Sequence, residues 1–310
     1  MYDAVALGEL LVDFTCRETD KDGYPVLAAH PGGAPANFLA VLAHYGMKTA
    51  LLAKVGDDAF GRLLRRTAAQ AGIDTAGIVV DGSAFTTMAF VTLDADGDRD
   101  FSFARKPGAD MLLRYDELDL SLIDRTRVFH FGSVSMTDEP SRDATRRAAE
   151  YARSRGRLVT YDPNLRIPLW KDLSQARQEI LWGLSMADVV KISDEEVAFL
   201  WDLPPQEGAE KLLRDCPAGL VFVTCGAAGC YYAGRQGAGH VDCPPVHPVD
   251  TTGAGDIFMG SAVAHLLRTG KRPEELDAAQ LRQIAAAACT EASLSTEHCG
   301  GISSIPRYDR

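Results

Sequence analysis

A stretch near the C-terminal end combines small residues and an acid in a pattern suited to binding and transferring a phosphate. Residues 250–258 read DTTGAGDIF, and apolar residues at helical spacing follow them. We therefore expect the small residues at a helix N-terminus, where free backbone N–H groups and the helix dipole attract phosphate. These residues are Gly253, Ala254 and Gly255. Asp256 in the first helical turn can then accept a proton from an attacking hydroxyl. The plainer alternative is an acid that only stabilises the helix N-terminus.

A second group of polar and flexible residues lies in the stretch HPGGAPANFLAVLAHYG, at positions 30–46. Gly32 and Gly33 form a turn, and Asn37 stands at the start of an apolar helical run. Paired glycines let a polar ligand contact the backbone, and an amide side chain both donates to and accepts from a sugar hydroxyl. The plainer alternative is a glycine turn followed by an Asn-capped helix.

Composition excludes several classes of function. The chain has 310 residues, 46% of them hydrophobic, which is enough for a substantial core. A net charge of −11 disfavours nucleic acids and anionic membranes as partners. Asp3, Glu9 and Asp13 interrupt the apolar N-terminal stretch, so it fits neither a signal peptide nor a membrane span, and we expect a cytoplasmic protein. The seven cysteines form no C-x-x-C pair and are expected to be reduced, structural thiols.

The elements that must position these residues follow an alternating pattern. Short β-rich runs such as VALGELLVDF and TALLAKVG alternate with amphipathic stretches such as NFLAVLAHYG and GRLLRRTAAQAG. This alternation predicts an α/β layer fold with a mainly parallel sheet. We find no internal repeat or long linker, so we expect one domain over residues 1–310.

One segment departs from the alternation. Residues 84–104 read AFTTMAFVTLDADGDRDFSFA, which predicts two strands around a DADGD turn, with Phe101 and Phe103 on one face. A hairpin without a crossover helix indicates a small sheet outside the main one, and residues 24–30 can supply a partner strand. We therefore expect a small β lid inserted in two pieces, at about 14–31 and 84–106.

The two signatures, GGAPANFLAVLAHYG and DTTGAGDIF, resemble those of the ribokinase-like, or PfkB, carbohydrate kinases, in the same order and at a similar separation. Four stretches between them are similar to the fructokinase branch: FVTLDADGDRDFSFARKPGADMLL, FHFGSVSMTDEPSR, TYDPNLRIPLW and VVKISDEEVAFL. The resemblance covers nearly the whole chain. It implies a ribokinase-like fold with a central, mainly parallel sheet flanked by helices and with a small inserted lid.

The resemblance also implies roles for single residues on the sugar side of the site. Asp256 matches the catalytic base, and the amides of the three residues before it match an anion hole. Four residues match positions that bind sugar hydroxyls: Asp13, Gly32, Gly33 and Asn37. Of these, Asp13 should make the strongest hydrogen bonds, because its acceptor group is charged. Two arginines match positions that reach substrate or phosphates, where they would offset phosphate charge: Arg105 and Arg166. The alternatives are a solvent-exposed strand-end acid for Asp13 and exposed side chains for both arginines.

On the nucleotide side, the resemblance points to four positions around ATP, although glycines after a strand also mark an ordinary β-turn. They are Ser193, Thr224, Gly226 and Gly229. Many relatives carry Asn-x-x-Glu for magnesium water and phosphate contacts. This chain has Ser193 in place of the asparagine and keeps the acid as Glu196, which implies a water-mediated contact with Mg²⁺. The resemblance further implies a K⁺ site that uses oxygens of Asp250 and Thr252. Gly260 and Ser261 depart from the family pattern by small-for-small changes.

The sequence thus predicts an ATP-dependent sugar kinase, most simply a fructokinase that makes fructose 6-phosphate. Aminoimidazole riboside kinase and 2-keto-3-deoxygluconate kinase share the DPNLR-like and lid features and stay open as alternatives. From another class, a catalytically inactive sugar- or nucleotide-binding regulator is the alternative, and the intact GAGD argues against it. A nicotinamide dehydrogenase lacks support because no G-x-G-x-x-G follows the first strand. The resemblance implies a homodimer through paired lids.

Overall fold

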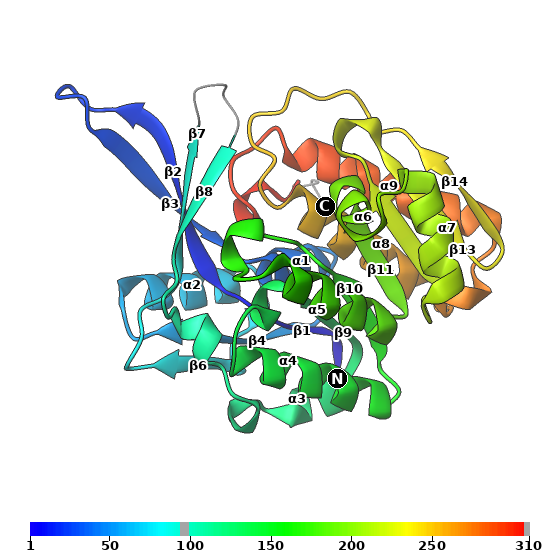
Figure 1. Ribbon diagram of the computed structural model, residues 1–310, viewed down its shortest axis with the longest axis horizontal. Helices are drawn as coiled ribbons and strands as arrows, with labels where there is room; N and C mark the ends of the chain where they lie inside the picture. Colours follow the sequence, from blue (N-terminus) through cyan, green and yellow to red (C-terminus); the bar gives the residue numbers. More distant parts are fainter. Residues whose placement is uncertain (94–98, 307–310) are drawn as a thin grey trace.

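The computed structural model describes residues 1–93 and 99–306, which form a large sheet with helices on both faces and a smaller second sheet (Figure 1). The large sheet has the strand order β14-β13-β12-β11-β10-β9-β1-β4-β5, and β6 also pairs with β4. Its strands are β1 (Tyr2–Leu7), β4 (Thr49–Gly56), β5 (Ile73–Asp74), β6 (Ile78–Asp81), β9 (Thr126–Gly132), β10 (Leu158–Asp162), β11 (Val189–Ser193), β12 (Leu220–Thr224), β13 (Cys230–Gly234) and β14 (Gly237–Val241). All neighbouring pairs are parallel except β12–β13 and β13–β14. The predicted, mainly parallel α/β sheet is confirmed.

Helices cover both faces of this sheet, which divides the core in two. One face packs against α1 (Ala34–His44), α2 (Ala59–Gln70), α8 (Ala254–Thr269) and α9 (Ala278–Ser295). The other packs against α3 (Leu120–Asp124), α4 (Ser141–Ser154), α5 (Leu173–Met186), α6 (Asp194–Trp201) and α7 (Pro205–Asp215). Because parallel strands lie between helices, they carry near-continuous apolar runs. No helix in the described ranges is long and apolar enough to cross a membrane.

The second sheet projects from one end of the body, as Figure 1 shows at its upper left. Its order is β3-β2-β7-β8, from β2 (Leu11–Thr19), β3 (Pro25–Gly32), β7 (Met88–Leu93) and β8 (Arg99–Ala104). The antiparallel pair β7–β8 is the predicted hairpin, although its DADGD turn lies outside the described residues. Phe14 of β2 stacks on Phe90 of β7, with ring centroids 5.3 Å apart, and meets Phe60 of α2 edge-on. These contacts pack the base of the second sheet onto the body of the protein. The whole second sheet is called the lid below.

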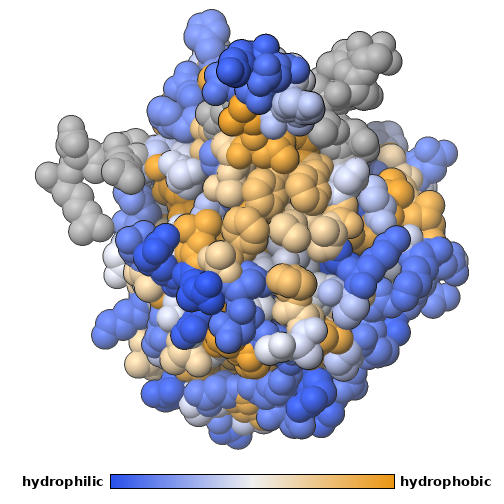
Figure 2. Space-filling model, turned by 90° about the vertical axis from the view of Figure 1, so that its left-hand side faces the viewer, coloured by the Kyte–Doolittle hydropathy of each residue, from blue (hydrophilic) through white to orange (hydrophobic). Residues whose placement is uncertain are grey.

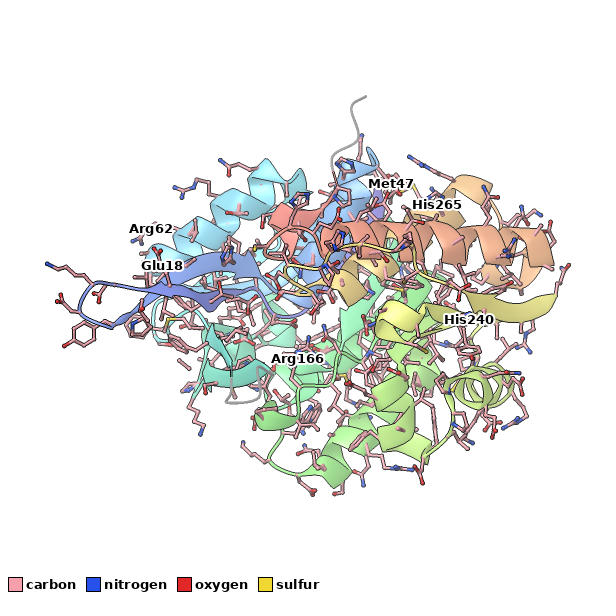
Figure 3. All side chains as sticks on the ribbon, turned by 90° about the horizontal axis from the view of Figure 1, so that it is seen from above. Glu18, Met47, Arg62, Arg166, His240 and His265 are labelled. Carbon is pink, nitrogen blue, oxygen red and sulfur yellow. The ribbon has the colours of Figure 1, made fainter. Side chains whose placement is uncertain are left out.

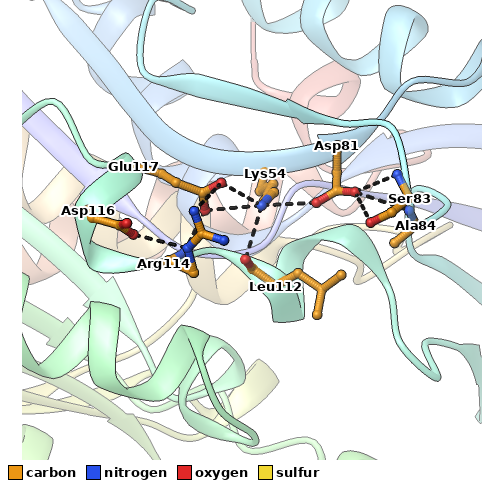
Figure 4. A network of polar contacts seen from close by, with 8 residues as sticks. All are labelled: Lys54, Asp81, Ser83, Ala84, Leu112, Arg114, Asp116 and Glu117. Carbon is orange, nitrogen blue, oxygen red and sulfur yellow. Dashed lines mark hydrogen bonds and ion pairs between the residues drawn. The ribbon is translucent and has the colours of Figure 1, made fainter.

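A buried lysine ties the large sheet to the segment that follows the lid (Figure 4). Lys54 of β4 donates to the Leu112 carbonyl at 3.1 Å and to both oxygens of Glu117 at 2.8 and 3.0 Å. It also pairs with Asp81 of β6 at 2.9 Å. Three acceptor groups surround the three N–H bonds of its ammonium group, so this buried charge is fully compensated.

Candidate active site

The acid of the DTTGAGD motif lies in the first turn of α8, as the sequence predicts. Gly253 caps this helix in the left-handed region at φ 78°, which glycine adopts without strain. A Cβ at Gly253 would also lie only 3.0 Å from the Gly301 Cα. The amides of Ala254 and Gly255 follow at the helix N-terminus, and Asp256 is buried just after them. The anion-binding end of the helix and a carboxyl group therefore occupy one place.

Two asparagine side chains hold this carboxyl group in position. The Asn37 Nδ2 donates to Oδ2 of Asp256 at 2.8 Å, and the Asn164 Nδ2 donates to Oδ1 at 3.2 Å. Burial raises the pKa of Asp256, whereas the Asn37 hydrogen bond and the nearby Lys191 and Arg166 lower it. Asn164 lies in DPNLR and adopts the left-handed conformation at φ 53°, which asparagine tolerates best among residues with a side chain. Sequence reasoning predicted Asn37 as a sugar ligand and missed Asn164.

Asp13 and the paired glycines meet where the lid joins the body. Strands β2 and β3 pair Leu11 with Gly32, and a Cβ at Gly32 would lie 2.1 Å from Asp13 Oδ2. Only glycine therefore leaves room for this carboxyl group. Gly33 has a φ of 117°, and its missing Cβ would lie 2.4 Å from the Glu9 carbonyl oxygen. Asp13 lies within β2 and is half-buried, so it is not a strand-end acid in open solvent, and burial raises its pKa to about 6.

The two predicted arginines have different surroundings. Arg166 is exposed, and its charge lowers the pKa of both Asp13 and Asp256. In the view from above, it lies between the lid end, marked by Glu18, and the far strand end, marked by His240 (Figure 3). Arg105 is only 5% exposed, so the exposed alternative is wrong for it.

Arg105 makes contacts within the protein instead. Its guanidinium pairs with Asp110 at 2.7 Å and donates to Thr137 Oγ1 at 2.8 Å and to the Val134 carbonyl at 3.1 Å. It thereby fastens the segment that follows β8 to the loop after β9. Contact between Arg105 and a substrate stays a prediction.

The positions predicted to bind nucleotide gather at the carboxyl ends of β11 and β12. Ser193 and Thr224 are register partners at these ends, and Gly226 and Gly229 follow Thr224 with φ values of 53° and 97°. Ligands commonly bind at the carboxyl ends of parallel strands. Ser193 caps α6: its Oγ accepts from the Glu196 N–H at 3.1 Å, so the substituted serine has a structural task.

Glu196 and Asp250 are both fixed by backbone amides. The Glu196 carboxylate accepts from the N–H groups of Leu165 at 2.7 Å and Ser193 at 2.8 Å, which joins the DPNLR loop to the start of α6. Asp250 accepts from the Thr252 and Gly300 N–H groups, both at 2.9 Å. Carboxylate oxygens are hard ligands, so the chemistry of both residues suits a hard cation or its water ligands. Cation binding itself stays a prediction.

Comparison with known proteins places this geometry in a family. The model of the pfkB family carbohydrate kinases matches residues 1–307. The chain belongs to this family of carbohydrate kinases. It is 41% identical to probable fructokinase-4 of Arabidopsis thaliana over 97% of this chain and 93% of the relative. It is 43% identical to fructokinase-1 of Zea mays over 97% of this chain and 94% of the relative.

Solved structures of sugar kinases share the fold of this carbohydrate kinase. The fructokinase of Xylella fastidiosa with bound ATP has a TM-score of 0.88 at 29% identity, over 99% of this chain and 96% of that one. The fructokinase of Vibrio cholerae in a fructose, ADP and calcium form has a TM-score of 0.86 at 30% identity, over 98% and 96%. The predicted ribokinase-like fold and the predicted class, a phosphotransferase acting on a sugar hydroxyl, are confirmed.

The pKa shifts predict how the activity of this kinase depends on pH. In its predicted role as the acceptor of two sugar hydroxyls, Asp13 must be ionised, so its raised pKa of about 6 predicts a loss of kcat/KM below about pH 6. The charge of Arg166 lowers the pKa of Asp13. In Arg166→Gln the fall of kcat/KM on the acid side of the pH profile should therefore begin at a higher pH, independent of any change in the maximum value of kcat/KM. The measurement is kcat/KM between pH 4.5 and 8, and an unmoved limb in the variant would contradict the assignment.

Proposed function

We propose that the protein is an ATP-dependent fructokinase, which transfers the γ-phosphoryl group of ATP to the primary hydroxyl of D-fructose at C6. The observation that carries the proposal is Asp256, held by two asparagine amides beside the N-terminus of α8. Asp13 and Gly32 supply an acceptor for sugar hydroxyls at the lid junction. The named activities of the relatives give the substrate class.

In the proposed reaction, Asp256 accepts the proton of the attacking hydroxyl while the sugar oxygen forms a bond to the γ-phosphorus. The bond from this phosphorus to the β–γ bridging oxygen breaks, and its electron pair stays on ADP. The amides of Gly253, Ala254 and Gly255 bind the oxygens of the phosphoryl group as it crosses. Asn37 and Asn164 keep the carboxylate aimed at the hydroxyl, which lowers the entropy cost of reaching the reactive arrangement.

Around the nucleotide, Thr224, Gly226 and Gly229 form the loop proposed to bind ATP, with Ser193 beside it. Mg²⁺ would neutralise phosphate charge, and Glu196 would reach it through water because Mg²⁺ usually keeps several waters. Asp250 and Thr252 are the proposed oxygen donors for K⁺. The cytoplasmic location predicted from the sequence stays a prediction.

Fructose is favoured over an acidic sugar by the surroundings of Arg105. Ketodeoxygluconate carries a carboxylate, which calls for an arginine clamp. Arg105 is paired with Asp110 at 2.7 Å and is buried, so its charge is already compensated within the protein. Only Arg166, of the two arginines, presents an exposed side chain to the site. A neutral ketohexose fits this balance of charge better.

Incubation with fructose, ATP and Mg²⁺ tests the proposal. We expect ³¹P NMR to show a sugar phosphate monoester at C6 and a matching amount of ADP. Exchange of K⁺ for Na⁺ at constant ionic strength should lower the rate. Absence of the monoester would overturn the fructokinase proposal, and equal rates in the two salts would overturn the K⁺ site alone.

We also propose that the lid mediates a homodimer. Tyr24 is 69% exposed, and Val26 and Leu27 of β3 are also exposed. Figure 2 shows the molecule from the side on which the lid projects, and apolar side chains gather in the upper middle of this face. Of the two aromatic residues predicted for this role, Phe103 is half-buried and the side chain of Phe101 lies outside the described residues.

Light scattering should give the mass of a dimer at micromolar concentration, and replacement of Tyr24 and Leu27 by Ser should give the monomer. A monomeric native protein would refute the lid dimer.

A further inference from the structure

A buried lysine that the sequence analysis did not single out lies beside the proposed anion hole. Lys191 belongs to β11, whose neighbouring residues Val189, Val190 and Ile192 are fully buried and apolar. Its own side chain is 8% exposed. Because an ammonium group is costly to bury, a lysine in such a strand requires compensating partners or a function. The apolar run VVKIS interrupted by one charge is the sequence signal that could have found it.

The ammonium group of Lys191 lies against the first turn of α8. A Cβ at Gly255 would stand 2.7 Å from the Lys191 Nζ and 3.5 Å from its Cε. Nζ therefore lies within contact distance of Gly255, one of the three residues whose amides are proposed to bind the phosphoryl group. The absence of a side chain at Gly255 leaves room for this ammonium group.

The partners of Lys191 compensate its charge and leave it capable of another contact. Nζ donates to the two oxygens of Asp162, at the end of β10, at 3.2 and 3.1 Å. In the described part of the chain, no other hydrogen bond of Nζ is found, although an ammonium group has three N–H bonds. Asp162, Glu196 and Asp256 raise the pKa of Lys191 against the effect of burial, so it stays charged.

Lys54 offers a contrast within the same protein. It is equally buried, but Leu112, Asp81 and Glu117 surround its ammonium group with acceptors. Lys191 instead has one carboxylate partner and stands beside the positive end of α8, which repels it. A buried cation and a helix N-terminus that face one another are both stabilised when an anion binds between them.

We propose that Lys191 is a catalytic residue that donates a hydrogen bond to the phosphoryl group in transfer, an inference that rests on the proposed kinase reaction. Its charge offsets the negative charge spread over the equatorial phosphoryl oxygens, together with the three backbone amides. Asp162 holds the ammonium group in place. Lys191 gives up no proton in this step, because the hydroxyl proton goes to Asp256.

The test compares Lys191→Met with Lys54→Met, which removes a buried, paired lysine outside the site. Removal of one transition-state donor should lower kcat for fructose at least ~10²-fold in Lys191→Met. The Kd values for fructose and ADP should stay within about threefold of the wild type, and Lys54→Met should lower the unfolding temperature but change kcat by less than about threefold. An equal loss of kcat in both variants would overturn the proposal, since it would assign the effect to a lost ion pair.

A transition-state mimic separates contact from stability. The wild type should bind ADP with aluminium fluoride and fructose much more tightly than ADP with fructose alone, and Lys191→Met should lose most of this gain. Asp162→Asn/Lys191→Met removes both charges of the pair, so its unfolding temperature should recover whereas its kcat should not. An undiminished aluminium fluoride effect in Lys191→Met, or recovery of kcat in the double variant, would overturn the proposal. A wild type inactive on fructose would instead refute the proposed substrate.

Discussion

Replacement of Asp256 by Asn should lower kcat at least ~10²-fold, because the amide cannot accept the proton of the attacking hydroxyl. The substitution keeps the size of the side chain and its place in the first turn of α8. Binding of ADP and fructose should therefore persist. Turnover is measured by coupled ADP release, and binding is measured by calorimetry.

Glu150→Gln is the matched control for this variant. Glu150 is an exposed acid of α4 and belongs to none of the proposed sites, so its replacement changes the charge by the same amount elsewhere in the protein. Its kcat should equal that of the wild type. Near wild-type turnover in Asp256→Asn would show that another group accepts the proton, and the assignment of the base would fail.

Local signals in the sequence predicted the elements that carry the site. A run of small residues before an acid and an apolar helical pattern correctly placed Asp256 in the first turn of α8. Alternation of polar and aromatic residues indicated the β7–β8 hairpin. Propensity, turn chemistry and periodicity are encoded within a few neighbouring residues, so such features can be read without the structure.

Features that depend on strand order were beyond this reasoning. The register pairs Tyr161 with both Phe131 and Val190, so β10 lies between β9 and β11 and brings Asp162 beside Lys191. Neither residue has a local pattern that names its partner. The same holds for Asn164, which meets Asp256 across 92 positions of the chain.

Arg105 shows that the surroundings of a side chain depend on segments far away in the sequence. The sequence places it in a polar stretch, FARKPGAD, which is compatible with an exposed side chain or with a ligand contact. The structure buries it against Asp110, Thr137 and the Val134 carbonyl. Burial of an arginine depends on whether acceptors from distant segments converge on it, and no local pattern records that.

Selectivity for fructose is the second large effect expected of this protein. We predict that kcat/KM for fructose exceeds the values for ketodeoxygluconate, ribose and aminoimidazole riboside by at least ~10²-fold, or about 2.7 kcal/mol. The proposed role of Asp13 is to accept hydroxyls of a neutral sugar, whereas Arg105, already paired with Asp110, offers little compensation for a substrate carboxylate. Ala104, next to Arg105, provides no aromatic surface for an imidazole ring.

Measurement of ADP release in parallel on these four substrates, with ATP, Mg²⁺ and K⁺ held constant, tests the assignment as a fructokinase. We predict that fructose gives the highest kcat/KM by at least ~10²-fold and that Asp256→Asn abolishes this signal with fructose. If ketodeoxygluconate, ribose or aminoimidazole riboside matches or exceeds fructose, the chain is still a carbohydrate kinase by family, but the assignment as a fructokinase is contradicted.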